Sequence, residues 1–350
     1  MITLDVSKNW IVLFPFRMEA ARTAGEELSR CVHLLRKAGA PALGAPPAAD
    51  ALGPAPADSV PIMVLHSEED GEERNGFVWR AGQDRVEIYG DSGRGLCNGV
   101  YDFLEALGFR WPKPGVENSP RGEAARPWLF PLERTQGRAV SQAIPARRRM
   151  FLSGNRKTQE ALIPWAARNR IDALVLPPEH GRSFSPKKTG NSPVQGELLP
   201  PLAARYALFP EMGGWTLSLL VPRRYFYFHR DIFRMAEGKR VKDYNFCPTN
   251  PETISLIREE AENLFRSHPE IRVFHLWPDR GNEKNWCACP SCRAFTPAEQ
   301  NRIAVNAAAD VLLEINPRGL LSYYEDSDEP GNIAIRPNMF PAGGFIPPPD

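Results

Sequence analysis

The sequence contains no apolar run that approaches the roughly 20 residues needed to cross a bilayer, so we expect no membrane-spanning helix. Residues 1–20 include a short apolar stretch, but it has neither a preceding basic segment nor a small-residue cleavage site. This stretch is therefore a poor match to a signal peptide. We expect a cytoplasmic protein with no membrane partner.

The chain also has almost no net charge, because 43 Lys and Arg residues stand against 42 Asp and Glu residues in 350 positions. This balance argues against broad electrostatic binding to nucleic acid or to an anionic membrane. With 42% hydrophobic and 24% charged residues, the chain is able to bury cores and is not disordered overall. Proline is abundant, at 35 residues, and predicts an irregular, loop-rich protein.

Several catalytic motifs are missing. The sequence has no G-x-S-x-G and no H-E-x-x-H, which argues against a serine hydrolase and a zincin metalloprotease. Residues 90–95 (GDSGRG) resemble a phosphate-binding loop, but no Lys-Ser or Lys-Thr follows them. We therefore interpret these glycines as residues that allow a tight turn.

The first part of the chain has the pattern of a small α+β domain. Its predicted strands cover residues 11–14, 61–66, 76–81 and 85–90, and its predicted helices cover 18–38 and the end of 90–108. We assign residues 1–120 to this domain. Residues 121–145 carry scattered prolines without a period and are predicted to be a linker.

Strands and helices alternate in residues 146–350. The predicted strands are 147–152, 171–177, 271–277 and 319–324, and the predicted helices are 159–170, 251–267 and 297–315. This order predicts a parallel sheet with helices outside it, as in a TIM-like (β/α) barrel. Because the segment is shorter than the about 250 residues of a full barrel, we expect the barrel to be incomplete or irregular near its C-terminus.

Aromatic residues are concentrated where the mouth of such a barrel is expected. Sugar rings present apolar C–H faces that stack on aromatic side chains, so this pattern favours a carbohydrate site. The candidate substrate-binding residues are His180, Trp215, Trp277, Trp286 and Tyr323. The alternative is that the individual aromatic residues belong to the core and that His180 is an ordinary loop residue.

Carboxylates that follow predicted strands are the candidate catalytic groups. Asp279 leaves the strand 271–277 at its C-terminal end, where the catalytic side chains of barrels are found. Glycoside hydrolysis needs two convergent groups, so Asp279 is paired with Glu283, Glu325 or Asp326. In the alternative interpretation these carboxylates cap or solvate their loops.

The six cysteines are distributed unevenly, and three of them, Cys287, Cys289 and Cys292, lie within six positions. This spacing favours a metal site over a secreted disulfide framework. Zinc normally takes four ligands, and Cys247 is the candidate for the fourth, with a His or a water as alternatives. A thiol-lined loop without metal and a local disulfide remain open. Such a zinc ion would stabilise the cysteine-containing loop rather than take part in catalysis.

Two parts of the chain resemble known families. GFVWRAGQDRVEIYGDSGRGLCNGVYDFLEALGFRWPKPG resembles the small α+β domain that precedes the barrel in hexosaminidases and α-glucuronidases. The segments EMGGWTLS, FRMAEGKRVKDYNFCPTNPE and WPDRGNEKNWCACPSC are similar to the domain-of-unknown-function 4838 family, which overlaps glycoside hydrolase family 163. The resemblance covers most of residues 10–325.

The resemblance implies a retaining glycosidase on a TIM-like barrel that acts on β-linked N-acetylglucosamine-containing glycans, with Asp279 at the strand end and no cofactor needed for catalysis. An acidic residue often follows this Asp in the family, whereas this chain has Arg280. A non-catalytic carbohydrate-binding protein on the same scaffold is therefore the alternative, and a zinc-stabilised interaction module is a third hypothesis. The oligomeric state is left open.

Overall fold

The structure is a computed structural model that describes residues 2–5, 10–15, 17–35, 62–67, 74–82, 85–120, 129–132, 135–139, 143–176, 201–279, 285–324 and 331–347. The chain divides into two compact units. Unit 1 comprises Met1–Leu174, Val194–Phe209 and Phe345–Asp350, and unit 2 comprises Val175–Pro193 and Pro210–Gly344. None of the described helices combines the length and apolar character that crossing a bilayer requires.

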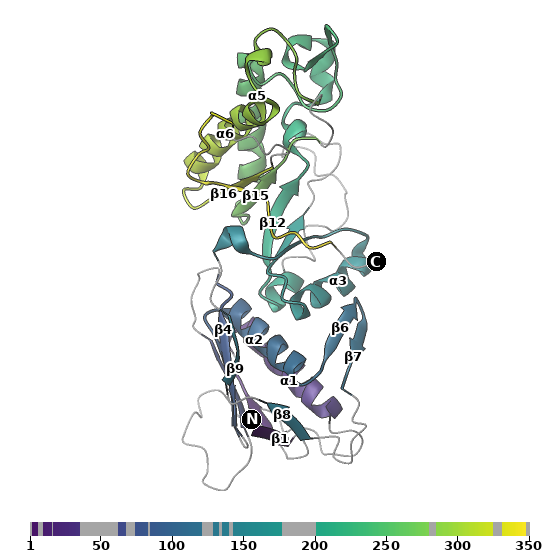
Figure 1. Cartoon of the computed structure of the whole chain (residues 1–350), viewed down its shortest axis with the longest axis vertical. Helices are drawn as coiled ribbons and strands as arrows, with labels where there is room; N and C mark the ends of the chain where they lie inside the picture. Colours follow the sequence, from purple (N-terminus) through teal and green to yellow (C-terminus); the bar gives the residue numbers. More distant parts are fainter. Residues whose placement is uncertain are drawn as a thin grey trace. The chain divides into compact units, whose positions relative to one another are not determined.

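Unit 1 is built on a five-stranded mixed sheet covered by two helices (Figure 1). The strand order is β2 (Ile11–Leu13), β3 (Ile62–Ser67), β5 (Arg85–Gly90), β4 (Phe77–Ala81) and β9 (Thr135–Ala139). The first three strands are parallel, and β4 runs antiparallel to both of its neighbours. Helices α1 (Glu19–Leu35) and α2 (Gly93–Ala106) pack against each other and against the sheet.

The helices of unit 1 follow from local sequence signals. The apolar stripe of α1, which includes Leu28, Val32 and Leu35, is buried against the sheet. Helix α2 begins after Ser92, whose side chain accepts a hydrogen bond from the Gly95 backbone N–H. A Cβ atom at Gly95 would lie 2.1 Å from the Gly76 carbonyl oxygen, so the glycine permits this tight turn.

Further elements complete unit 1. Strand β1 (Ile2–Asp5) pairs antiparallel with β8 (Leu129–Leu132), and β6 (Arg110–Lys113) forms a hairpin with β7 (Val116–Asn118). They are followed by β10 (Arg149–Phe151), α3 (Arg156–Arg168) and β11 (Ala173–Leu176), whose last two residues belong to unit 2.

Residues 121–145 were predicted to be a linker, but the structure has two strands in this segment, β8 and β9. Both strands are specified by backbone pairing with β1 and β4, which are distant in sequence, and local composition does not reveal such partners. The predicted domain boundaries at residues 120 and 145 stay predictions.

Unit 2 is an α/β arrangement around parallel strands. Strands β12 (Phe209–Gly214, of which Phe209 belongs to unit 1), β15 (Val273–Leu276), β16 (Leu320–Tyr323) and β17 (Met339–Pro341) lie side by side in that order. Each neighbouring pair is parallel. Helices α5 (Pro251–Ser267) and α6 (Pro297–Ile315) connect β12 to β15 and β15 to β16. Within the described residues these strands form an open sheet, so closure into the predicted TIM-like barrel is not observed there.

The two crossover helices have the predicted bounds, 251–267 and 297–315, because their ends carry strong signals. Asn250 caps α5 by accepting a hydrogen bond from the Glu252 N–H, and Pro251 occupies the first turn. Thr296 and Glu299 form a reciprocal capping box at the start of α6. The two helices pack against each other beside β16 (Figure 1). Their apolar faces and Phe274 of β15 form one core.

A short irregular region separates β12 from α5. It contains the two-residue strands β13 (Met235–Ala236) and β14 (Lys239–Arg240), together with three 3₁₀ helices, Leu217–Leu220, Arg223–Tyr227 and Arg230–Ile232. β13 pairs antiparallel with β14. This region follows the carboxyl end of β12.

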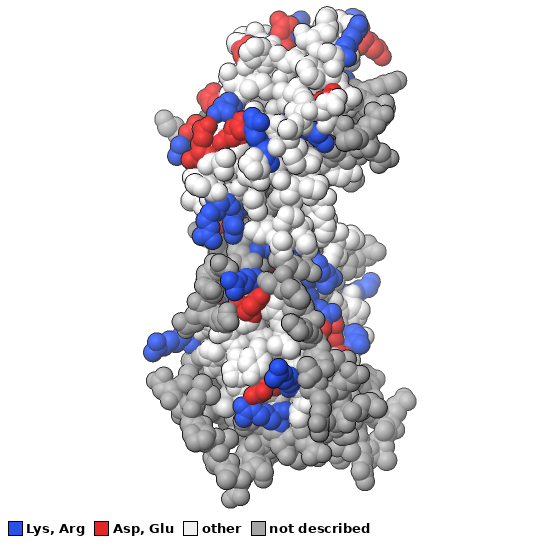
Figure 2. Space-filling model, turned by 60° about the vertical axis from the view of Figure 1, so that its left-hand side comes forward, with Lys and Arg blue, Asp and Glu red and all other residues white. Residues whose placement is uncertain are grey.

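Charges of both signs lie interspersed on the surface shown in Figure 2, and uncharged residues cover much of the area between them. Several opposite charges form ion pairs on the helices of unit 2, among them Arg258 with Glu314 and Arg266 with Glu262. Such exposed pairs contribute little to stability individually.

Gly213 of β12 lies in close contact with the backbone of His275 in β15. Its φ is +125°, a backbone conformation that favours glycine, and a Cβ atom there would lie 2.0 Å from the His275 carbonyl oxygen. The sequence FPEMGG has little strand propensity, and β12 is not among the strands predicted from the sequence. The strand forms because the parallel neighbour β15 pairs with it.

We predict that Gly213→Ala lowers the free energy of unfolding by about 3 kcal/mol or more, because it adds backbone strain and overpacks the β12–β15 contact. Chemical denaturation of the whole chain would measure the effect. Gly343→Ala is the matched control, since a Cβ atom there meets nothing within 4 Å. Equal stability of the two variants would contradict the prediction.

Candidate functional site

The carboxyl ends of β12, β15 and β16 meet at one edge of the sheet in unit 2. The register places Gly213 opposite His275, and His275 opposite Ser322. Because the strands are parallel, the residues that follow each of them emerge together at this edge. In barrel enzymes this is the edge that carries the active site.

Three aromatic residues directly follow these three strands and contact one another. The Trp215 ring centroid lies 5.2 Å from that of Trp277 and 4.8 Å from that of Tyr324, at interplanar angles of 70° and 67°. Trp277 and Tyr324 are 6.1 Å apart. Trp277 is buried, whereas Trp215 and Tyr324 are partly exposed. The edge therefore presents aromatic surface, which is suited to stacking against an apolar ring face. We call these three residues the aromatic cluster.

Asp279 lies two residues after Trp277, and its side chain is 25% exposed. One carboxylate oxygen accepts a hydrogen bond from the Ser218 hydroxyl at 2.9 Å, and the other lies 3.2 Å from Arg223 Nη2. The Asp279 backbone N–H donates to Asn245 Oδ1 at 2.9 Å. These contacts fix the carboxylate and its backbone while leaving part of the side chain accessible.

The guanidinium beside Asp279 is itself perturbed. Burial lowers the pKa of Arg223 from its ordinary value, and the carboxylates of Asp279 and Asp243 act in the opposite direction. Arginine stays protonated under such conditions, so Arg223 remains a positive partner for Asp279.

A buried polar network lies beneath the aromatic cluster. His275 Nε2 is 2.9 Å from Glu211 Oε2, and His275 Nδ1 is 2.8 Å from Ser322 Oγ. The Trp277 indole N–H donates to the same Ser322 oxygen at 2.8 Å. Glu211, His275 and Ser322 are each 0% exposed, so every one of these polar groups depends on its protein partners.

The network closes when each proton has one acceptor. With a neutral His275, all three contacts are satisfied when Ser322 accepts from the Trp277 indole N–H and donates its hydroxyl proton to His275 Nδ1, and the Nε2–H of His275 donates to Glu211. This arrangement joins β12, β15 and β16 through side chains. It also fixes the orientation of Trp277, which belongs to the aromatic cluster.

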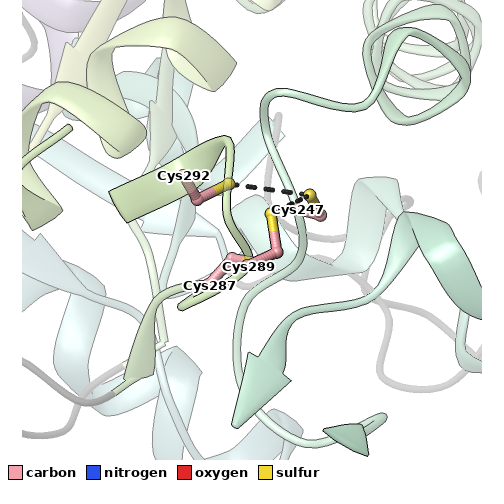
Figure 3. A group of neighbouring side chains, drawn as sticks. All are labelled: Cys247, Cys287, Cys289 and Cys292. Carbon is pink, nitrogen blue, oxygen red and sulfur yellow. Dashed lines mark hydrogen bonds between the residues drawn. The ribbon is translucent and has the colours of Figure 1, made fainter. Parts of the chain in front are cut away.

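The four cysteines proposed as metal ligands come together (Figure 3). Their Sγ atoms all lie within 4.8 Å of one another, and all four side chains are buried. Cys247 lies between β14 and α5, whereas Cys287, Cys289 and Cys292 lie between β15 and α6. The thiol cluster therefore connects the two segments that follow the carboxyl ends of β12 and β15.

The close sulfur atoms influence one another's protonation. Hydrogen bonds from the Cys287 and Cys292 thiols lower the pKa of Cys247. The interaction with Cys247 raises the pKa of Cys287 to about 11 and also raises the pKa of Cys292. These opposite shifts arise because Cys247 accepts hydrogen bonds from Cys287 and Cys292, which favour the thiolate form of Cys247 and the protonated form of its two donors.

The other predicted site residues have different positions. Trp286 is 8% exposed and packs edge-to-face on Phe246 at 5.9 Å, and Tyr323 is 7% exposed; both belong to the core of unit 2. Their burial does not favour substrate contact, and Tyr324 provides the exposed ring next to Tyr323. The predicted His180, Glu283, Glu325 and Asp326 lie outside the described residues.

Five further residues, Glu211, His275, Ser322, Asn245 and Ser218, were not predicted to have a role at the site. For the first three a signal exists, because each is a polar residue inside an otherwise buried strand, in FPEMGG, VFHL and LLSY. A polar side chain at such a position needs a buried partner. No pattern in the sequence identifies which partner that is.

We predict that Ser322→Ala lowers the free energy of unfolding by about 2–4 kcal/mol, because His275 and the Trp277 indole each lose a buried hydrogen-bond partner. Ser255→Ala, which removes an exposed hydroxyl bonded to the Pro251 carbonyl, is the matched control and should change stability by less than about 0.5 kcal/mol. Urea denaturation of both variants would measure this difference. A Ser322→Ala protein as stable as the control would contradict the network.

Comparison with known proteins relates the chain to hexosaminidases by fold alone. No family model matches the sequence, and no curated protein matches it. The *Streptomyces plicatus* N-acetyl-β-hexosaminidase in complex with Thio-NAglucal is 15% identical, with a TM-score of 0.52, over 92% of this chain and 62% of that chain.

Two further structures align with the chain. A family 20 exo-β-N-acetylglucosaminidase from *Vibrio harveyi* is 14% identical over 97% of this chain and 54% of that chain, with a TM-score of 0.48. The family 20 β-N-acetylhexosaminidase from *Streptomyces coelicolor* A3(2) is 14% identical over 92% and 63%, with a TM-score of 0.47. The chain thus spans between about half and two thirds of the length of these enzymes. The Streptomyces plicatus structure shows that the chain has an α/β fold similar to that of this enzyme.

Proposed function

We propose that the chain is a glycoside hydrolase that acts on β-linked N-acetylglucosamine-containing glycans. The observation that carries this proposal is the position of Asp279, a partly exposed carboxylate that emerges beside the aromatic cluster at the carboxyl edge of the sheet. Aromatic surface can hold a sugar ring, and a fixed carboxylate near it can supply one of the two carboxyl groups that glycosidase chemistry typically uses.

The segments that follow β12 and β15 carry the aromatic residues and Asp279, and hydrogen bonds connect these two segments. The Trp277 backbone N–H donates to the Gly214 carbonyl at 2.8 Å, and the Leu217 backbone N–H donates to the Trp277 carbonyl at 3.0 Å. The Ser218 hydroxyl then binds Asp279. A sugar stacked on Trp215 would therefore lie beside segments whose positions are determined by direct hydrogen bonds.

Asp279 is suited to orient the substrate or to stabilise positive charge on it rather than to donate a proton. Its two oxygens contact Ser218 and Arg223, and a carboxylate held in this way can orient the 2-acetamido group of the substrate or stabilise positive charge at the anomeric carbon. The proton for the leaving oxygen then comes from a second carboxyl, for which Glu283 and Glu325 are the candidates. The reaction is retaining, by a paired-carboxyl or a substrate-assisted route, and needs no cofactor.

The fold agrees with this proposal. The *Streptomyces plicatus* structure that shares it is an N-acetyl-β-hexosaminidase bound to a sugar analogue. Fold alone does not specify chemistry, so the proposal depends on the residues at the sheet edge.

A non-catalytic carbohydrate-binding protein is the second candidate. The observation that favours it is that both Asp279 oxygens already have protein partners, Ser218 and Arg223. In that case the aromatic cluster would bind a glycan without hydrolysing it.

We predict that the whole chain hydrolyses a chromogenic β-N-acetylglucosaminide or releases sugar from a free N-glycan, and that Asp279→Asn lowers kcat at least about 100-fold. The substitution is isosteric and removes the charge that would orient or stabilise the reacting sugar. Asp310→Asn on α6, which removes a carboxylate paired with Arg336, is the matched control and should leave kcat unchanged.

Binding assays with the same glycans separate the two candidates. Hydrolysis that depends on Asp279 supports the glycosidase, whereas glycan binding without turnover supports the binding protein. Trp215→Ala should weaken substrate binding about 10-fold in either case, because it removes the exposed stacking surface. Activity unaffected by Asp279→Asn would overturn the assigned role of Asp279.

A further inference from the structure

We propose that Cys247, Cys287, Cys289 and Cys292 hold one zinc ion as a tetrahedral four-thiolate site, and that this ion joins the two loops that position Asp279. The four side chains are the only cluster of three or more potential metal ligands among the described residues. All four are buried, and they come from two chain segments that are far apart in sequence.

The sulfur–sulfur distances fit a mononuclear site. Zinc binds thiolates at about 2.3 Å, so two ligands of a regular tetrahedron lie about 3.8 Å apart. Cys247 Sγ lies 3.7 Å from Cys289 Sγ and 3.6 Å from Cys292 Sγ. These two distances match the separation expected around a single ion, and all four sulfur atoms lie within 4.8 Å of one another.

Other thiol chemistry fits less well. All six cysteines of the chain are free thiols, and the sulfur separations are far longer than the about 2.05 Å of a disulfide. An iron–sulfur cluster places its own metal and sulfide core between the cysteines, which would have to lie further apart than the 4.8 Å observed. Four soft thiolate ligands close enough to share one ion favour zinc.

The surroundings supply donors that offset the negative charge of a four-thiolate zinc site. The Met235 backbone N–H donates to Cys287 Sγ at 3.2 Å, and Arg240 Nη1 approaches the same sulfur at 3.7 Å. The Thr249 hydroxyl lies 3.1 Å from Cys292 Sγ. Donors of this kind orient the ligands of a metal site and tune its affinity.

Helix α6 also holds the cysteine-rich segment. The Gln300 side chain accepts from the Cys287 N–H at 3.1 Å and donates to the Cys287 carbonyl at 3.2 Å and to the Cys292 carbonyl at 3.3 Å. The Ala288 N–H donates to the Met235 carbonyl at 2.9 Å. The backbone of the cysteine-rich segment is thus held by the Gln300 side chain and by the Met235 carbonyl.

The link from the thiol cluster to Asp279 is Asn245. This fully buried residue lies two positions before Cys247, and its Nδ2 donates to the Asn285 carbonyl, two positions before Cys287, at 3.2 Å. Its Oδ1 accepts from the Asp279 N–H. An ion that joins Cys247 to Cys287 therefore keeps Asn245 in position as a support for Asp279. The consequence for catalysis depends on the proposed function, whereas the zinc site itself does not.

The first experiment measures metal content. The whole chain, expressed with zinc in the medium and dialysed, should contain about one zinc per chain. Replacing zinc with cobalt should produce the thiolate-to-cobalt charge-transfer absorption and the intense visible bands of a tetrahedral site. Well below one zinc per chain, together with a cobalt spectrum lacking thiolate absorption, would overturn the proposal.

Variants separate these ligands from other thiols. Cys289→Ser should lose the zinc, whereas Cys97→Ser, a buried thiol in α2, should retain it. If Cys289→Ser does not fold, Thr249→Val provides the test, because it removes only the hydroxyl beside Cys292 and should weaken zinc affinity roughly 10- to 100-fold in a chelator competition. Unchanged affinity in Thr249→Val and zinc retention in Cys289→Ser would each contradict the site.

Hydrogen exchange tests the link to Asp279 without any assay of activity. Removing zinc with a chelator should raise amide exchange in peptides covering 241–249 and 276–287, and should leave the α2 peptides of unit 1 unchanged. Increased exchange throughout unit 2 would also support the proposal, because it would show that zinc stabilises the whole unit and not only these two segments. Unchanged exchange around Asp279 in zinc-free protein would overturn the link, whether or not the chain hydrolyses glycans.

Discussion

The candidate site depends on the buried hydrogen-bond network of Glu211, His275 and Ser322, because it joins the three strands whose ends carry the functional groups. Each of these side chains would be costly to bury alone, and together they satisfy one another. The network holds only when β12, β15 and β16 keep their register. That register places Trp215, Trp277 and Tyr324 next to each other at the carboxyl edge.

Above this network, the loops that extend from the sheet are held by contacts of a different kind. Ser218, Arg223 and Asn245 each contact Asp279, and the thiol cluster lies where the same two loops meet again. A functional carboxylate on a loop has little precision by itself, because exposed loops open at low free-energy cost. Contacts from the segment between β12 and α5 to this residue, which follows β15, supply that precision here. The irregular segments of this proline-rich chain are therefore ordered around the site by side-chain interactions rather than by regular secondary structure.

The elements with strong local signals were predicted well. Helices α5 and α6 have capping residues and first-turn prolines, and their observed bounds are those predicted. Strands β12, β8 and β9 were not predicted, since FPEMGG contains a proline and two glycines and the other two strands lie in a segment without periodicity. Their pairing partners are distant in sequence, and no local propensity encodes such a partner. The aromatic residues were predicted only in part. Tyr323 is the last residue of β16 and belongs to the core, whereas Tyr324 directly follows the strand and lies at the edge.

The sequence alone determined the alternation of strands and helices, the position of Asp279 after a buried strand, and the spacing of three cysteines that suits a metal. These features are local, and they follow from periodicity, capping and the chemistry of neighbouring residues. Only the tertiary structure decided that Glu211 meets His275, that Asn245 supports Asp279, and that Cys247 joins the other three thiols. Each of these contacts spans more than 30 residues, and such contacts form only when the parallel strands and their crossover helices bring distant segments to the same edge of the sheet.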